Sequence, residues 1–356
     1  KTNLTRFNLF FPEQRDFFVR DAHIFQFGGL NETNGIPFFS RRIGLPFDRE
    51  NPEPLDLDVG AKLSGRIGRY TLGLLNTQMG SGQGIGSKNL SVARMTRDIQ
   101  KESRLGAMMT YGNPTSGDDN GLIGADYRYR NSELFGSQVL VADVFMMKSF
   151  SEGINNNELA YGATLELPND KWNLKTSYVE IQDNFNPALG FVNRTGIRKY
   201  TGDLRYRVRP KGNKFVRFMN WGFESSFTTT KDNELESANV WLRIFDIEGH
   251  MGDQIAFWTN WEHETLFTPF EIQPGIIIPR GDYDFFNVWG KLVTSTHRPV
   301  AAEIRSKIGG YYSGNFVDVT AKLLFRPSRH IYITLERRVF DINLPQGDFD
   351  IEINRW

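Results

Sequence analysis

The residues best suited to chemistry lie near the start of the chain, where Glu13, Arg15 and Asp16 are followed by Arg41 and Arg42. The planar guanidinium of arginine binds oxyanions through paired hydrogen bonds, so this group could contact a carboxylate, a phosphate or a sugar. Buried charges also need partners, and the same arginines could pair with Glu13, Asp16 or other carboxylates and fix the segment in place. We favour this structural interpretation.

Phenylalanines are interleaved with these charges. Aromatic rings can stack on sugar rings, but a set of this size more often supplies the apolar core of the segment that carries it. The predicted binding residues of this first group are Glu13, Arg15, Asp16, Phe38, Phe39, Arg41 and Arg42. A second group lies in the stretch 182–196, which is too long and too apolar for a tight hairpin and is therefore either a packed loop or an inward fold. Its candidate residues are Asp183, Asn184, Asn186 and Arg194.

Signatures of catalysis are weak. The five histidines form no metal-ligand spacing, so we predict no metal site. The glycine-rich stretch 80–87 has no following helix and no Lys-Ser/Thr in register, so it predicts a hairpin loop and not a phosphate loop. We assign no catalytic residue and no cofactor, and the sequence favours a protein that is not an enzyme.

Composition narrows the class of protein. Lys and Arg together number 42, as do Asp and Glu, so no global field points to nucleic acid. There is no cysteine, which excludes disulfides and thiolate metal sites. No run of about 18 apolar residues exists that would predict a transmembrane helix. The chain begins at Lys1 without an initiator Met or a signal sequence, so we expect a mature or trimmed product.

From Leu57 onward the sequence alternates with a period of two, which is typical of strands. In the run 199–208, for example, Tyr200, Leu204 and Tyr206 alternate with charged residues. Such runs predict roughly 16 strands, many of about 9 to 13 residues. They are longer than the usual soluble strand of about 5 to 6 residues and match the roughly 9 to 11 needed to cross a bilayer.

No amphipathic helix separates these runs, so the strands are expected to pair in antiparallel order. Closure of the sheet would remove its edges and give the backbone N–H and C=O groups hydrogen-bond partners in lipid. We therefore predict an all-β fold, an antiparallel transmembrane β-barrel of roughly 16 to 18 strands. Residues 56–356 would form the barrel, and residues 1–55 an irregular, plug-like segment folded into its lumen. A soluble β-rich hydrolase is the alternative that we weigh against it.

Five stretches of the sequence resemble a known family, the uncharacterised outer-membrane β-barrel domain that follows a carbohydrate-binding module family 9-like domain in Gram-negative bacteria. The stretches are NLTRFNLFFPEQRDFF (residues 3–18), PFFSRRIGLP (37–46), GAKLSGRIGRYTLGLLNTQ (60–78), NLSVARMTRDI (89–99) and DNFNPALGFVNR (183–194). The resemblance implies a bacterial outer-membrane barrel whose N-terminal carbohydrate-binding-like domain is absent here. It also implies a barrel truncated at its C-terminus. The family has no established activity.

We expect the protein to pass or capture a small polar solute, such as a saccharide, at the outer membrane. The alternative is a membrane-anchored carbohydrate-binding scaffold, or a carbohydrate-active enzyme for which the barrel is a platform. The expected partners are membrane lipid, a saccharide or another small polar ligand, and a periplasmic or cell-surface protein. No nucleic-acid partner is expected.

Overall fold

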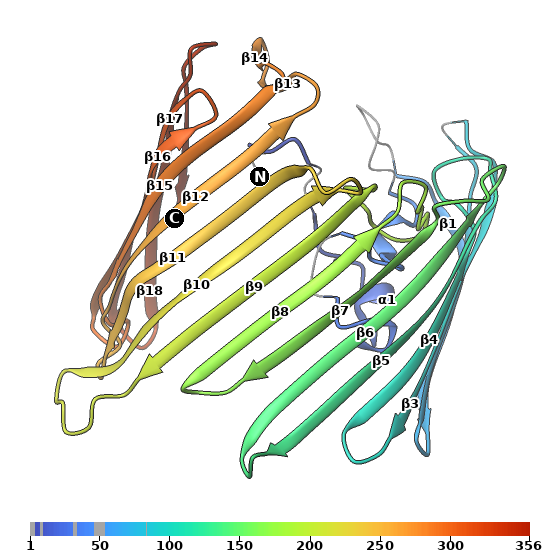
Figure 1. Cartoon of the computed structure of the whole chain (residues 1–356), viewed down its shortest axis with the longest axis horizontal. Coiled ribbons are helices and arrows are strands. Elements are labelled where there is room, and N and C mark those ends of the chain that lie inside the picture. The colour runs from blue at the N-terminus through green and yellow to red at the C-terminus, as the bar shows by residue number, and fades with distance from the viewer. Residues whose placement is uncertain (1–3, 8–9, 31–33, 46–53, 83) are drawn as a thin grey trace. The chain divides into compact units, whose positions relative to one another are not determined.

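The computed structural model of the protein describes residues 4–7, 10–30, 34–45, 54–82 and 84–356. Nearly all of its regular structure is β-strand, which confirms the all-β prediction (Figure 1). Three short helices precede the sheet in the described residues: α1 (Asp16–Val19), η1 (Ala22–Phe25) and η2 (Ser40–Arg42).

Seventeen strands form one large antiparallel sheet, in agreement with the predicted number, and two more form a separate hairpin. The strands of the sheet are β1 (Leu57–Ile67), β2 (Tyr70–Met79), β3 (Lys88–Ile99), β4 (Ser103–Tyr111), β5 (Asn120–Leu134), β6 (Gln138–Ser151), β7 (Leu159–Pro168), β8 (Trp172–Ile181), β9 (Ile197–Val208), β10 (Val216–Thr230), β11 (Leu235–Gly249), β12 (Gln254–Leu266), β15 (Gly281–Val293), β16 (Val300–Tyr311), β17 (Gly314–Ser328), β18 (Ile331–Asn343) and β19 (Phe349–Arg355). The hairpin consists of β13 (Phe270–Gln273) and β14 (Ile276–Ile278).

Strands that follow one another in the sequence pair in antiparallel order, as β1 does with β2 and β17 with β18. The β13–β14 hairpin interrupts this order, so β12 pairs with β15. Strands β1 to β12 have 9 to 15 residues, longer than the strands of most soluble sheets. Among the described residues, no pairing that closes the sheet into a barrel is detected.

The chain divides into two compact units, which we describe separately. The N-terminal unit contains residues 7–167 and 177–199. The C-terminal unit contains residues 1–6, 168–176 and 200–356. In the C-terminal unit, the β13–β14 hairpin packs in a core with Leu266 and Ile342.

The two faces of each strand differ in character because side chains alternate across a strand. On β1, Lys62, Ser64 and Arg66 lie on what we call the polar face, and Leu63 and Ile67 on the apolar face. Large side chains remain exposed at apolar-face positions of many other strands. They include Leu74, Met95, Leu105, Met109, Ile123, Val144, Met146, Leu165, Leu242, Ile255, Leu292, Ile304, Leu323 and Leu335.

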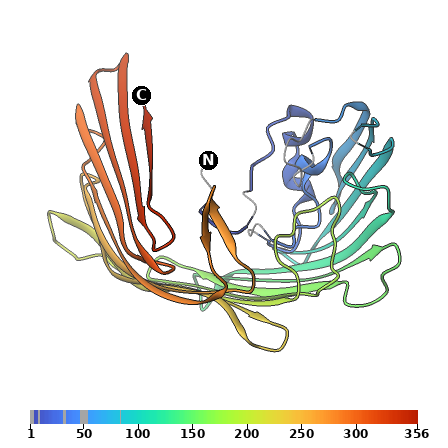
Figure 2. The ribbon, with the colours of Figure 1, turned by 90° about the horizontal axis from the view of Figure 1, so that it is seen from above.

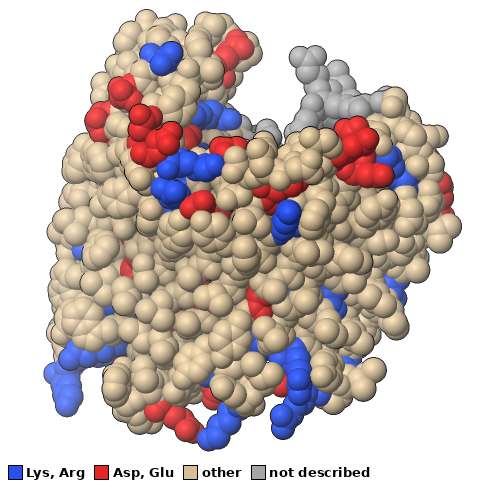
Figure 3. All heavy atoms as spheres, turned by 45° about the vertical axis from the view of Figure 1, so that its right-hand side comes forward, with Lys and Arg blue, Asp and Glu red and all other residues tan. Residues whose placement is uncertain are grey.

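Charged side chains are sparse across the middle of the face shown in Figure 3. There, Lys, Arg, Asp and Glu gather in the upper part and along the lower margin, and only a few are visible between them. In the described part of the chain, no helix has the length and apolar character needed to cross a membrane.

In the N-terminal unit, the segment before β1 packs on the polar face of the sheet (Figure 2). Its phenylalanines enter a core with apolar side chains at one end of that face, such as Val92 and Met108. Glycines provide the space: a Cβ at Gly73 would lie 2.8 Å from Ile24, and one at Gly124 would lie 2.7 Å from Phe27. The division into residues 1–55 and 56–356 remains a prediction.

Candidate functional site

The structure brings the two sequence-predicted groups together. The stretch around residues 36–42 forms an antiparallel bridge with the loop 182–196, between Ile36 and Phe191. The Phe39 amide donates to the Leu189 carbonyl at 2.8 Å. The Phe39 ring is buried and lies 5.7 Å from the Phe191 ring. The loop is therefore packed against the N-terminal segment.

Glu13 and Arg15 form an ion pair of 2.7 Å between Oε2 and Nη2. Ser40 Oγ also donates to Glu13, and Arg15 donates to the carbonyls of Ser40 and Ile43. Burial alone would raise the pKa of Glu13, but the hydrogen bonds from Arg15 and Ser40 outweigh it and lower the pKa to about 2. Glu13 is therefore ionised at neutral pH and ties two parts of the segment together.

The other residues of the first group take different positions. Asp16 is exposed at the first position of α1. Phe38 packs on the core of the N-terminal unit, with its ring 5.6 Å from that of Phe25. The guanidinium of Arg41 lies 5.6 Å from the centre of the Phe11 ring.

Arg42 completes the first group and also connects it to the second. Its Nε donates to the Gly190 carbonyl at 3.0 Å, so this guanidinium binds backbone of the loop 182–196. Gly190 itself is packed closely against the chain, since a Cβ there would lie 1.9 Å from the Ile36 carbonyl oxygen.

The second group is held mainly by backbone and amide contacts. Asn184 Nδ2 donates to the carbonyl of Asn156 at 3.0 Å, and the carbonyl of Asn186 accepts from Asn120 Nδ2 at the same distance. Asp183 is exposed. The Arg194 guanidinium lies 4.0 Å from the centre of the Phe7 ring.

These contacts are internal to the N-terminal unit. Charged and aromatic residues of both groups hold the segment and the loop against each other, and a ligand role for them remains a prediction.

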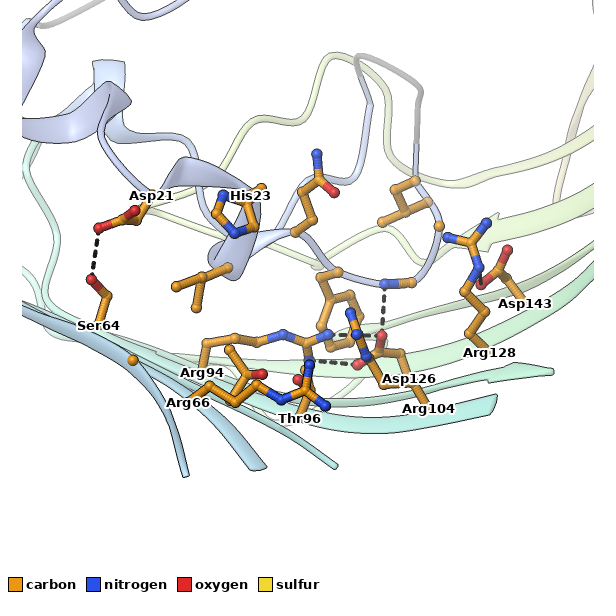
Figure 4. Close-up of a pocket in the computed structure, with 18 of the residues that line it drawn as sticks. Asp21, His23, Ser64, Arg66, Arg94, Thr96, Arg104, Asp126, Arg128 and Asp143 are labelled. Atoms are coloured by element: carbon orange, nitrogen blue, oxygen red, sulfur yellow. Dashed lines mark hydrogen bonds and ion pairs between the residues drawn. The ribbon is translucent and has the colours of Figure 1, made fainter. Parts of the chain in front are cut away.

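A pocket of about 500 Å³ lies in the N-terminal unit, between the segment and the charged half of the polar face (Figure 4). The segment contributes the turn from Phe27 to Leu30 and the residues around η1, and the sheet contributes side chains of β1 to β7. The charged residues that line the pocket are Asp21, Arg66, Arg94, Arg104, Asp126, Arg128, Asp143 and Glu166.

The fixed centre of this pocket is an ion pair between β3 and β5. Arg94 is only 3% exposed and binds Asp126 through both terminal nitrogens, with Nη2 to Oδ2 at 2.9 Å. The backbone N–H of Gly28 also donates to Asp126, at 3.1 Å. Gly106 makes room for the pair, because a Cβ there would lie 2.5 Å from Asp126 Oδ1.

Around this centre, three arginines keep much of their side chains exposed: Arg66 by 61%, Arg104 by 51% and Arg128 by 48%. Arg66 and Arg104 share Asp98, with nitrogen-to-oxygen distances of 2.8 and 2.9 Å. Arg128 approaches Asp143 at 3.8 Å. Their remaining N–H groups are available to a ligand.

The pocket contains equal numbers of basic and acidic side chains, four of each. Donors of the arginines and acceptors of the carboxylates face a common space, as Figure 4 shows for Arg66, Arg104, Arg128 and Asp143. Such an arrangement is suited to a small polar ligand that both donates and accepts hydrogen bonds and has no net charge.

Sequence reasoning did not select these pocket residues as a site. It did place Arg66, Asp126 and Arg128 on the charged faces of predicted strands, and that was the available signal. Cross-strand register decides which charges meet, and alternation within single strands carries no information about it.

Comparisons of the chain with protein-family models, with curated proteins and with solved structures found no match.

Proposed function

We propose that this protein is an outer-membrane β-barrel that passes or captures a small polar solute, such as a saccharide. The observation that carries the proposal is the row of large apolar side chains left exposed along alternate positions of the strands, for example Leu63, Met109 and Ile304. A soluble protein rarely leaves so extensive an apolar surface in water.

Lipid is the partner that best accounts for this surface. Strands of 9 to 15 residues are long enough to cross the hydrocarbon layer at a tilt of about 45°. The charged residues in the upper part and along the lower margin of the face in Figure 3 suit the lipid headgroups, and the region of few charges between them suits the acyl chains. In lipid, closure of the sheet would pair the backbone N–H and C=O groups of the edge strands.

The N-terminal segment would then narrow the lumen. Three contacts fasten it to the sheet beside the pocket: Lys62 Nζ donates to the Phe17 carbonyl at 2.7 Å, Ser64 Oγ to Asp21 at 2.8 Å, and the Gly28 amide to Asp126. These contacts support a fixed constriction lined by the arginines and carboxylates of the pocket.

The balanced charge of the pocket favours an uncharged, hydroxyl-rich solute over an ion, because a saccharide can donate and accept hydrogen bonds around its ring. The resemblance to an outer-membrane barrel domain that follows a carbohydrate-binding-like domain is consistent with this solute class. On this proposal, the partners are membrane lipid and a saccharide.

Fractionation tests the membrane part. The protein should sediment with membranes after an alkaline wash and should dissolve only in detergent. A protein that stays soluble at high concentration without detergent would overturn the proposal.

Swelling of liposomes that contain the protein tests the passage of solute. Monosaccharides should enter faster than trisaccharides, and deletion of residues 10–30 should raise the rate for trisaccharides. Liposomes that stay impermeable even after this deletion would exclude passage. Saccharide binding in that case would favour the alternative, a membrane-anchored binding scaffold or enzyme.

A further inference from the structure

A second pocket, of about 480 Å³, lies on the polar face of the C-terminal unit. It is lined by residues of β15 to β18, together with Arg355 of β19. Five of its lining residues are basic and three are acidic. One of the five, Lys307, forms an ion pair of 2.6 Å with Glu262, which does not line the pocket, so the excess is a single positive charge. The pocket of the N-terminal unit, in contrast, is balanced. The pocket of the C-terminal unit therefore favours a negatively charged ligand.

Each carboxylate of this pocket is already bound by an arginine. Asp318 accepts two hydrogen bonds from Arg338, from Nε at 3.0 Å and from Nη2 at 2.7 Å. Glu303 forms an ion pair with Arg305 on the same strand, and Glu336 lies 3.0 Å from Arg355. The acidic side chains are thus neutralised locally.

Lys322 lies directly opposite Glu303 on β16 and Glu336 on β18, and both carboxylates are bound by arginines. Within the described part of the chain, its ammonium group makes no hydrogen bond or ion pair, and neither does the hydroxyl of Thr320 two residues earlier. Both residues lie on the polar face of β17 and line the pocket. Their donors are available to a ligand.

Cross-strand register places two arginines on either side of Thr320. Arg305 lies directly opposite it on β16, and Arg338 lies directly opposite it on β18. Side chains in such positions have Cβ atoms about 4.5 to 5.5 Å apart. The row therefore presents a hydroxyl between two guanidinium groups, whose planar N–H donors suit oxyanions.

An aromatic surface adjoins this row. Trp289 lines the pocket, and its ring packs edge to face on Trp258, with centroids 6.0 Å apart. Trp258 in turn packs on Trp241, with centroids 6.2 Å apart, so three indoles cross β15, β12 and β11. Indole rings provide a rigid apolar surface for the ring of a ligand.

We infer that this pocket binds an acidic saccharide, with its carboxylate at Arg305, Thr320, Arg338 and Lys322 and its sugar ring toward Trp289. The saccharide class rests on the proposed function, whereas the oxyanion site rests on the charges of the pocket itself. Binding to this pocket requires no passage of solute through the protein.

Calorimetry on the purified chain in a non-ionic detergent tests the inference with two sugars that differ at one carbon. Galacturonate carries a carboxylate where galactose carries a hydroxymethyl group. Galacturonate should bind at least about tenfold more tightly, because hydrogen bonds to charged groups are stronger than neutral ones. Raising the salt concentration should weaken the binding of galacturonate, because salt screens the exposed charges.

Variants locate the site. Arg305→Gln and Lys322→Gln should each weaken galacturonate binding about tenfold. Thr320→Val retains every charge and the volume of the side chain, and it should weaken binding severalfold without disturbing the ion pairs. Arg217→Gln is the matched control, because it removes an arginine paired with Glu248 outside the pocket, and it should bind like wild type.

The inference would be overturned if the two sugars bound equally well. It would also be overturned if the single variants Lys322→Gln and Thr320→Val both bound galacturonate like wild type. The proposed passage of solute fails by a different result, namely liposomes that remain impermeable to neutral sugars. Each idea can therefore fail while the other stands.

Discussion

The ion pair between Arg94 and Asp126 should be a major source of stability in the N-terminal unit, because it joins β3 to β5 beneath the docked segment. The Arg94 side chain is buried and that of Asp126 is only 13% exposed, and Asp126 also accepts the Gly28 N–H. Arg94→Met leaves a largely buried carboxylate without its cation, which typically costs about 3 to 5 kcal/mol. Asp126→Asn keeps an acceptor for Gly28 but leaves Arg94 uncompensated, so a loss of similar size is expected.

The double variant isolates the pairing. With both charges removed, no buried charge is left unpaired, so its loss of stability should be smaller than the sum of the two single losses by more than about 1 kcal/mol. Urea unfolding in detergent, followed by tryptophan fluorescence, measures the free energy of unfolding for each variant.

Arg104→Met serves as the control for loss of an arginine in the same pocket. Arg104 is half exposed and shares Asp98 with Arg66, so its removal should cost no more than about 1 kcal/mol. The reasoning is refuted if Arg94→Met and Arg104→Met cost the same, or if the losses at Arg94 and Asp126 simply add.

Three further predictions concern the residues that hold the segment, the loop and the strand ends. Because the folded-state pKa of Glu13 is lowered from 4.5 to about 2, its ionised form stabilises the fold above about pH 4.5, and this is lost as the pH falls toward 2. Between about pH 5 and pH 2, wild type should therefore lose roughly 3 kcal/mol more unfolding free energy than Glu13→Gln. Arg198→Met removes the cation that lies 3.0 Å from the buried Glu180, and urea unfolding should show that the free energy of unfolding falls by about 3 to 5 kcal/mol. Arg198→Lys keeps the positive charge, so its free energy of unfolding should fall by less. Gly190→Ala places a Cβ 1.9 Å from the Ile36 carbonyl oxygen, so limited proteolysis should cut the N-terminal segment faster than in wild type; an unchanged cleavage rate would contradict the contact.

Much of the sheet could be predicted from the sequence because apolar and polar residues alternate along many of the strands. The run around Tyr200, for instance, predicts a strand near residue 203, and the structure has β9 over Ile197–Val208. The β13–β14 hairpin was not predicted. Its strands have four and three residues, too few for a periodic pattern to be recognised.

The pockets could not be predicted in the same way, because they depend on register between strands. Arg94 and Asp126 are 32 residues apart, and they meet only because Gly106 on the intervening strand β4 leaves room for both side chains. Similarly, Thr320 lies between Arg305 and Arg338 through the pairing of three strands. A shift of one residue in either pairing would turn the arginine to the opposite face.

Glycines on the polar face connect these observations. In most sheets a glycine within a strand weakens it, because it has no side chain to pack. Here Gly73 and Gly124 receive Ile24 and Phe27 of the segment, and Gly106 receives the ion pair beside them. The cost to each strand is offset by the apolar surface that the segment buries at that point. Glycines at polar-face positions of several strands, together with a phenylalanine-rich segment elsewhere in the chain, are therefore the sequence feature by which such a docked segment can be predicted.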